Sequence, residues 1–214
     1  MPPLYLNGQP IVEVKSYKYL GVHVTSDLKW DTHITTICQK SKKLLGLMYK
    51  RFYTTVDSIF LCRFYISLVH PMLEYACQVW DPYTHKNIAK LESVQKFALK
   101  VCSHCWNIDY DTLLDIFHLP SLSAWREYLR ITTLHKFITG NFTFPCGILI
   151  PRAANRSTRT TTVTTNSFNI PFVSTVSYKA SFVPRTLCMY NSLGVDYTSQ
   201  TVNSFINMFK CMLL

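Results

Sequence analysis

The stretch of sequence that decides the fold is YKYLGVHV at residues 17–24, followed closely by LKWDTHI at residues 28–34. The first part is rich in Tyr and Val, which is typical of an extended strand. The second part introduces a helix, because the apolar residues that follow Asp31 recur at steps of three and four. The chain is therefore expected to pass here from a small β segment into a helical body.

Further short strands are expected before this stretch. Residues 4–6 and 11–14 flank Asn7-Gly8-Gln9-Pro10, in which Asn-Gly supplies the positive φ angles of a tight turn. With residues 17–24 as a third extended run, the N-terminal segment is predicted to form a small hairpin sheet. An exposed edge of such a sheet would favour association with another chain.

The helix that begins at Asp31 is predicted to have an apolar stripe and a basic face. The stripe consists of Ile34, Ile37, Cys38, Ser41, Leu44, Leu45, Met48 and Phe52. At about 100° per residue, Lys43 and Lys50 fall opposite this stripe. The basic residues on the flanks are Lys40, Lys42 and Arg51. No acidic residue occurs in residues 32–56, so this face either solvates the helix or lies along nucleic-acid phosphates.

A second helix is expected to begin near Thr54 or Thr55, where a hydroxyl can cap the first turn. Pro71 should kink or break it, because proline lacks an N–H and clashes with the carbonyl of Ser67. Buried helix is then expected over residues 72–80, ending at Asp81-Pro82. Additional helices are predicted over about residues 86–102, after Asp109, and from Ser121 or Ser123 to Gly140.

The composition changes near the C-terminus. Residues 152–169 are mostly Arg, Ser, Thr and Asn, which indicates a linker or loop that contributes little burial. Three arginines would let this segment contact phosphates: Arg152, Arg156 and Arg159. Residues 172–190 and 202–214 restore apolar content. The last of these is expected to be a helix that docks back on the helical body through Val202, Phe205, Ile206 and Phe209.

The charge balance narrows the class of partner. The 214 residues contain 22 Lys and Arg against 12 Asp and Glu, a net charge of +10 that points to nucleic acid or an anionic membrane face. No membrane span is expected, since the most apolar stretch, residues 59–73, is interrupted by Arg63 and His70. The eight scattered cysteines are interpreted as reduced thiols of an intracellular protein, cytoplasmic or nuclear.

No catalytic or metal site is predicted. The chain has no adjacent Asp-Asp pair, no Gly-rich phosphate loop and no nucleophile elbow. The acidic group Asp109, Asp111 and Asp115 is typical of a helix start, where carboxylates cap free N–H groups. Cys102 and Cys105 form one close pair, whereas a structural zinc usually needs two; the alternative is that they sit at a helix end.

Three blocks of the sequence, in the same order, resemble jockey-like LINE-type (non-LTR) retrotransposon reverse transcriptases. The opening stretch is similar to the family pattern KYLG followed by L-x-W-x-x-H-I, which marks the passage from palm to thumb. Residues 65–80 and 91–96 are similar to thumb helices of the pattern P-x-L-E-Y … W … L-E-x-v-Q. Residues 185–210 resemble the closing block R-x-x-x-x-W-N-S-L-P … F-K, with Tyr190 and Gly194 in place of Trp and Pro.

The resemblance implies a fragment that begins after the catalytic palm. Its parts would be the palm end over residues 1–30, a thumb-like helical domain over residues 31–150 and an irregular C-terminal extension over residues 151–214. The expected fold class is thus mainly α, with a small N-terminal β-hairpin sheet. The catalytic aspartates and their Mg²⁺ would belong to the palm, so this chain alone is not expected to polymerise DNA or to need a cofactor of its own.

The expected partners are the backbone of RNA or an RNA–DNA duplex, and the palm region of the parent protein. The candidate phosphate contacts are Lys40, Lys42, Lys43, Lys50, Arg51, Lys90, Lys96, Lys100, Arg152, Arg156 and Arg159. Two alternatives stay open. In the first, the chain is a protein-interaction module whose basic face only keeps it soluble. In the second, it is a non-functional translated relic of the element, as the altered block at residues 190–194 would suggest.

Overall fold

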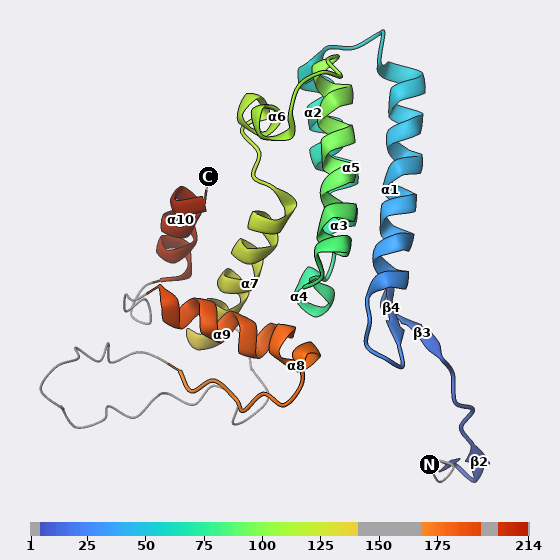
Figure 1. Ribbon diagram of the computed structural model, residues 1–214, viewed down its shortest axis with the longest axis vertical. Helices are drawn as coiled ribbons and strands as arrows, with labels where there is room; N and C mark the ends of the chain where they lie inside the picture. Colours follow the sequence, from blue (N-terminus) through green and yellow to red (C-terminus); the bar gives the residue numbers. More distant parts are fainter. Residues whose placement is uncertain (1–4, 141–167, 194–200, 214) are drawn as a thin grey trace, which may run out of the picture.

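The computed structural model describes residues 5–140, 168–193 and 201–213 (Figure 1). Within these ranges the chain is mainly helical, with two small antiparallel hairpins at its N-terminal end. The predicted fold class is therefore confirmed. The predicted phosphate-contacting arm with Arg152, Arg156 and Arg159 lies outside the described residues.

The N-terminal segment forms two separate hairpins rather than one sheet. Strands β1 (Tyr5–Leu6) and β2 (Gln9–Pro10) are joined by the predicted Asn7-Gly8 turn, with φ angles of 51° and 80°. Residues 11–14, predicted as a strand, lie outside any strand.

The prediction of one extended strand over residues 17–24 is wrong, because the chain reverses direction within it. The segment is a hairpin, formed by β3 (Ser16–Tyr19) and β4 (Val22–Thr25). Leu20 and Gly21 make the turn with φ angles of 46° and 88°. Two positive φ angles in a two-residue loop match the twist of the flanking strands, and Gly21 adopts this conformation without a steric penalty.

Helix α1 (Asp31–Phe52) confirms the predicted apolar stripe. Its buried residues include Ile34, Cys38, Ser41, Leu45 and Met48. Helix α2 (Ser58–Phe64) begins later than predicted, because the Asp57 side chain rather than a threonine caps it by accepting from the Phe60 N–H. A carboxylate satisfies a free N–H of the first turn and also favours the positive end of the helix dipole.

The irregularity expected at Pro71 takes the form of a π-helical segment. Helix α2 continues into the π-helix η1 (Tyr65–Val69) and then α3 (His70–Glu74), with Pro71 in the first turn of α3. The wider turn accommodates the missing proline N–H. The predicted uninterrupted helix over residues 72–80 is wrong, because Ala76 is left-handed with a φ angle of 55° and separates α3 from α4 (Cys77–Trp80).

The remaining helices of the first part agree with the sequence-based expectations. Helix α5 (His85–Ser103) lies beside α1 (Figure 1). Helix α6 (Tyr110–Phe117) is capped by Asp109 and helix α7 (Leu122–Ile138) by Ser121, each side chain accepting from the N–H three residues on. Gly140, with a φ angle of 77°, follows the end of α7.

The C-terminal part folds back onto α7. Helix α9 (Phe182–Ser192), which follows the short α8 (Val176–Ala180), crosses α7 near its lower end, and α10 (Val202–Leu213) packs against α7 (Figure 1). Phe205 and Phe209 are buried there, which confirms the predicted docking of the last helix. The ring of Phe205 stacks on that of His135 with a centroid distance of 4.0 Å.

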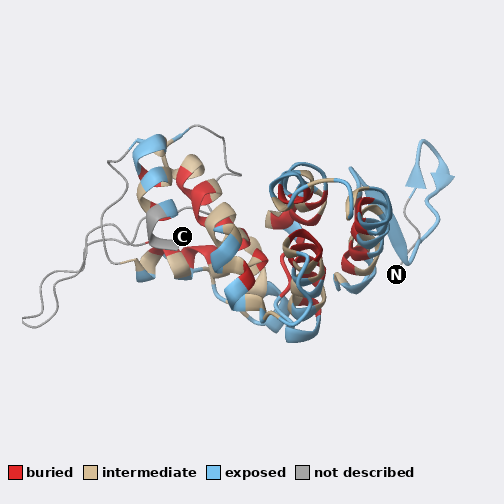
Figure 2. Cartoon of the chain, turned by 90° about the horizontal axis from the view of Figure 1, so that it is seen from above, coloured by how far each residue is buried: buried red, intermediate tan, exposed pale blue. Residues whose placement is uncertain are grey.

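The buried apolar residues form two clusters, visible as two groups of red ribbon in Figure 2. The first cluster joins the helices from α1 to α6 and the start of α7. The second joins the end of α7 to α9, α10 and Phe168. Helix α7 thus contributes to both clusters, so any interaction that fixes α7 holds the two halves together.

Candidate nucleic-acid interface

The exposed side of α1 carries a basic stripe, defined by Lys40, Lys43, Lys50 and Arg51. All four residues are exposed. At 3.6 residues per turn they fall within about 100° of one another around the helix axis and extend over about 17 Å along it. Lys42 is exposed as well, on the flank of α1 that faces α5. The structure therefore brings four of the five predicted basic residues of this helix to one side, whereas Lys42 lies about 160° around the axis from Lys40.

The orientation of this stripe is fixed by the opposite face of α1. Ile34, Leu45 and Met48 are fully buried there, so rotating the helix to hide its lysines would expose the core. Asp31 is the one acidic residue of α1, and it lies in the first turn, whereas Lys50 and Arg51 lie in the last. These last two residues also stabilise the negative end of the helix dipole, which gives them a structural role besides any contact with phosphate.

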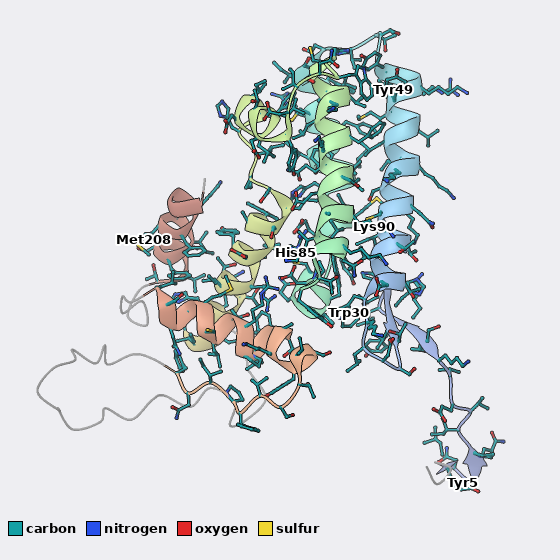
Figure 3. The ribbon with its side chains drawn as sticks, viewed as in Figure 1. Tyr5, Trp30, Tyr49, His85, Lys90 and Met208 are labelled. Carbon is teal, nitrogen blue, oxygen red and sulfur yellow. The ribbon has the colours of Figure 1, made fainter. Side chains whose placement is uncertain are left out.

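The predicted α5 lysines differ in their surroundings. Lys96 is exposed. The Lys90 ammonium donates to the hydroxyl of Thr35 at 2.6 Å and so ties α5 to α1 (Figure 3). The Lys100 ammonium donates to the main-chain oxygen of Trp106. Lys90 and Lys100 therefore serve the fold directly, and of these three only Lys96 extends the basic surface without such an internal bond.

No sequence pattern predicts the buried charge cluster, which we define as Glu74, Asp81, Arg126 and Arg130 with the partly exposed Glu92 and Arg185 at its edge. At its centre, Asp81 accepts from Arg126 Nε at 2.8 Å, from Arg130 Nη1 at 2.6 Å and from Arg185 Nη1 at 3.1 Å. Arg126 and Arg130 are each only 1% exposed. Asp81 follows α4, the first two arginines lie on α7 and the third on α9, so this carboxylate joins three segments.

The other side of the cluster surrounds Arg126. Its Nη1 lies 4.0 Å from Glu74 Oε1, and its Nη2 lies 4.0 Å from Glu92 Oε1. Both separations are too long for a hydrogen bond, and accordingly neither Nη atom nor either Glu74 oxygen has a hydrogen-bond partner. Glu92 is better satisfied, because it accepts from the N–H groups of Leu122 and Ser123 at the start of α7.

Burial also changes the protonation of this cluster. Desolvation raises the pKa of Glu74 from 4.5 to about 8, against the opposing effect of Arg126. Burial also disfavours the charged form of Arg130 and so lowers its pKa, although the neighbouring Asp81 opposes that shift. At neutral pH Glu74 is therefore mostly protonated.

The raised pKa of Glu74 predicts a loss of stability as the pH rises. In the unfolded chain Glu74 ionises near pH 4.5, whereas the folded protein holds its proton up to about pH 8. The folded state binds more protons between these pH values, so its free energy of unfolding should fall by up to about 1.4 kcal/mol per pH unit. Glu74→Gln should remove this slope in urea titrations at a series of pH values. Parallel pH profiles for the variant and the wild type would contradict the prediction, and Glu13→Gln, at an exposed position, is the control.

The acidic and thiol groups singled out in the sequence have structural roles. Asp109 accepts from both the N–H and the hydroxyl of Thr112, which confirms it as a helix cap. Cys102 is buried, with its pKa raised to about 12 by desolvation, and the His104 ring packs against Tyr53. Among the described residues, no three His, Cys, Asp or Glu side chains are grouped so that they would hold a metal ion.

Two further observations concern the surface. None of the helices in the described ranges is both long and apolar enough to cross a membrane. At the N-terminal end, large apolar side chains are exposed along both hairpins and in residues 11–14 between them, where Figure 2 shows an exposed arm standing away from the helices. These residues are Tyr5, Leu6, Ile11, Val12, Val14, Tyr17, Tyr19 and Leu20.

Comparison with known proteins gives distant similarities. The chain is 24% identical over 117 residues to a probable RNA-directed DNA polymerase from transposon X-element of Drosophila melanogaster, a match that covers 52% of this chain. It is 31% identical over 133 residues to the protein ARABIDILLO 2 of Arabidopsis thaliana. It is 26% identical over 129 residues to the uncharacterized protein B0403.1 of Caenorhabditis elegans.

These matches cover unequal shares of the relatives. They span 13% of the Drosophila protein, 14% of the Arabidopsis protein and 65% of the Caenorhabditis protein. No protein-family model matches the sequence, and no solved structure matches it significantly. Over about half of its length, the chain is therefore distantly similar to a transposon-encoded RNA-directed DNA polymerase.

Proposed function

We propose that this chain is the thumb and C-terminal part of a LINE-type, jockey-like reverse transcriptase, and that it binds the backbone of a template–primer duplex. The observation that carries the proposal is the basic stripe on α1, whose four residues are all exposed and lie in a segment without acidic residues. Its four charges follow one side of a straight helix, and a line of phosphates is a matching polyanion. The similarity to a transposon RNA-directed DNA polymerase supports the same assignment.

The contact would position the duplex without reading its sequence. Lysine ammonium groups on phosphate oxygens carry no base information, and an RNA–DNA duplex would be recognised by the path of its backbone. In this proposal the catalytic aspartates and their Mg²⁺ belong to the palm region of the parent protein. The chain contributes binding and orientation, and the palm is its second partner.

A titration at two salt concentrations tests the proposal. If four side chains neutralise phosphates, affinity for an RNA–DNA hybrid should fall about a hundredfold between 50 and 200 mM salt, because each contact releases condensed counterions. Fluorescence anisotropy of a labelled hybrid measures this directly. Affinity that is equal at both salt concentrations, or the absence of binding by a folded and monodisperse sample at low salt, would contradict the proposed function.

A second candidate function rests on the exposed apolar residues of the N-terminal hairpins. Tyr5 and Val12 are 63% and 80% exposed, and the short strands β1 and β2 have unpaired edges. Such a surface fits a protein partner, including the palm of the parent enzyme, better than it fits a polyanion. A chain that works only through this surface would not bind the hybrid even at low salt, so the same titration distinguishes this candidate from the first.

A further inference from the structure

Exposed aromatic rings gather where the C-terminal end of α1 meets the loop that follows α5. Tyr49 and Trp106 are 41% and 43% exposed, and their ring centroids lie 6.2 Å apart in an edge-to-face arrangement. The half-buried Tyr53 supports this pair, with its ring centroid 4.6 Å from that of Tyr49, and Figure 3 shows Tyr49 at the upper end of α1. We refer to Tyr49, Tyr53 and Trp106 as the aromatic platform.

Local backbone geometry holds the platform in place. His104 adopts the left-handed conformation, with a φ angle of 56°, which ends α5 and turns the chain back. The ring of His104 then packs on Tyr53 at 4.5 Å, and that of Trp106 contacts Phe97 of α5 at 6.0 Å. The rings are thus fixed before any ligand binds, so binding would cost little side-chain entropy.

The surroundings of the platform are basic. The Lys100 ammonium is hydrogen-bonded to the main chain of Trp106 itself, and Lys42 lies two helical turns before Tyr49 on the same flank of α1. No acidic residue occurs in residues 32–56 or 93–108, the two segments that build this tip. The ligand that suits the platform is therefore negatively charged and also offers flat apolar faces.

We infer that the aromatic platform stacks the unpaired bases of a nucleic acid whose backbone lies on the neighbouring lysines. Single-stranded nucleic acid combines phosphates with exposed base faces, whereas a blunt duplex hides its bases inside the stack. This inference rests on the proposed function and extends it, since the basic stripe would hold duplex backbone while the platform holds an adjoining single strand. Phe52, the other aromatic residue of this turn, packs on the rings of Phe60 and Phe64 rather than on Tyr49 or Trp106, and is not included.

The test compares a blunt RNA–DNA hybrid with the same hybrid carrying a short single-stranded RNA overhang. The wild type should bind the overhang hybrid about tenfold more tightly, a typical gain for base–aromatic stacking. Tyr49→Ala with Trp106→Ala should remove that gain, whereas Tyr49→Phe with Trp106→Phe should keep it, because the rings remain. Tyr17→Ala with Tyr19→Ala removes two exposed rings elsewhere and should retain the gain.

The possible outcomes distinguish a failure of the base-stacking inference from a failure of the proposed function. If the wild type binds both hybrids equally, or if the alanine variant keeps the overhang gain, the platform does not stack bases and the inference is overturned while the proposed function stands. If the wild type binds neither hybrid at low salt, both are overturned. Platform-dependent binding to phosphatidylserine vesicles, with no overhang gain, would assign the rings to a membrane surface and also overturn the inference.

Discussion

Replacing Asp81 with alanine is expected to lower the free energy of unfolding by about 5 kcal/mol. The reason is that Asp81 is the shared partner of three guanidinium groups, two of them almost completely buried. Without it, Arg126 and Arg130 would be left as buried charges with inadequate compensation, and removing one partner of a buried ion pair costs far more than the pair contributes. A loss of this size is comparable to the whole stability of many domains.

Urea unfolding followed by circular dichroism measures this effect. Asp57→Ala is the matched control, since Asp57 is an exposed aspartate whose loss removes one helix cap at a cost of about 1 kcal/mol. If Asp81→Ala does not fold at all, Asp81→Asn gives the second measurement, because it keeps one acceptor oxygen while removing the charge and replacing the other oxygen with an NH2 group. Equal losses for the Asp81 variants and Asp57→Ala would show that the buried charge cluster does not hold α7 and α9 in place.

Reversing the charge of the basic stripe is expected to weaken binding to an RNA–DNA hybrid by at least about a hundredfold at low salt. The variant carries Lys40→Glu, Lys43→Glu, Lys50→Glu and Arg51→Glu. The helical circular-dichroism signal should persist, since all four positions are exposed, with a small loss of stability from negative charge in the last turn of α1. Anisotropy titrations give the affinity, and the dependence on salt should also become flatter.

The control must change the net charge equally at another place. Lys15, Lys18, Lys179 and Lys210 are exposed, and none lies on α1 or α5. Replacing all four with Glu therefore lowers the total charge by the same amount while leaving the basic stripe intact. If this control loses affinity as strongly as the stripe variant, binding depends on overall charge and the assignment of the site to α1 is wrong.

Local signals explain which parts of the fold could be predicted. The boundaries and buried face of α1 follow from its apolar period, and the caps at Asp109 and Ser121 follow from side chains that bond three residues ahead. The second helix was misplaced because two threonines precede Asp57, and local sequence does not rank these competing caps reliably. The basic face of α1 could also be predicted, because each residue of a helix is rotated from the one before it by a fixed angle.

The break at Ala76 had no such signal. The main-chain oxygen of Tyr75 accepts from the indole Nε1 of Trp80 at 2.8 Å, and the Tyr75 hydroxyl donates to the main-chain oxygen of Leu20 at 3.1 Å. The second of these bonds joins residues 55 positions apart. A left-handed alanine is unfavourable by itself, so its place in the chain depends on contacts that exist only in the folded protein.

The sequence by itself determined the helical class, the orientation of α1 and the segregation of positive charge on its exposed side, because periodicity and charge are local properties. Only the tertiary structure decided that Asp81, Arg126, Arg130 and Arg185 meet in the interior, and that Tyr49 meets Trp106 at the surface. These groups come from segments far apart in the chain. Their meeting depends on how α5, α7 and α9 pack, and packing is a property of the whole set of helices rather than of any one of them.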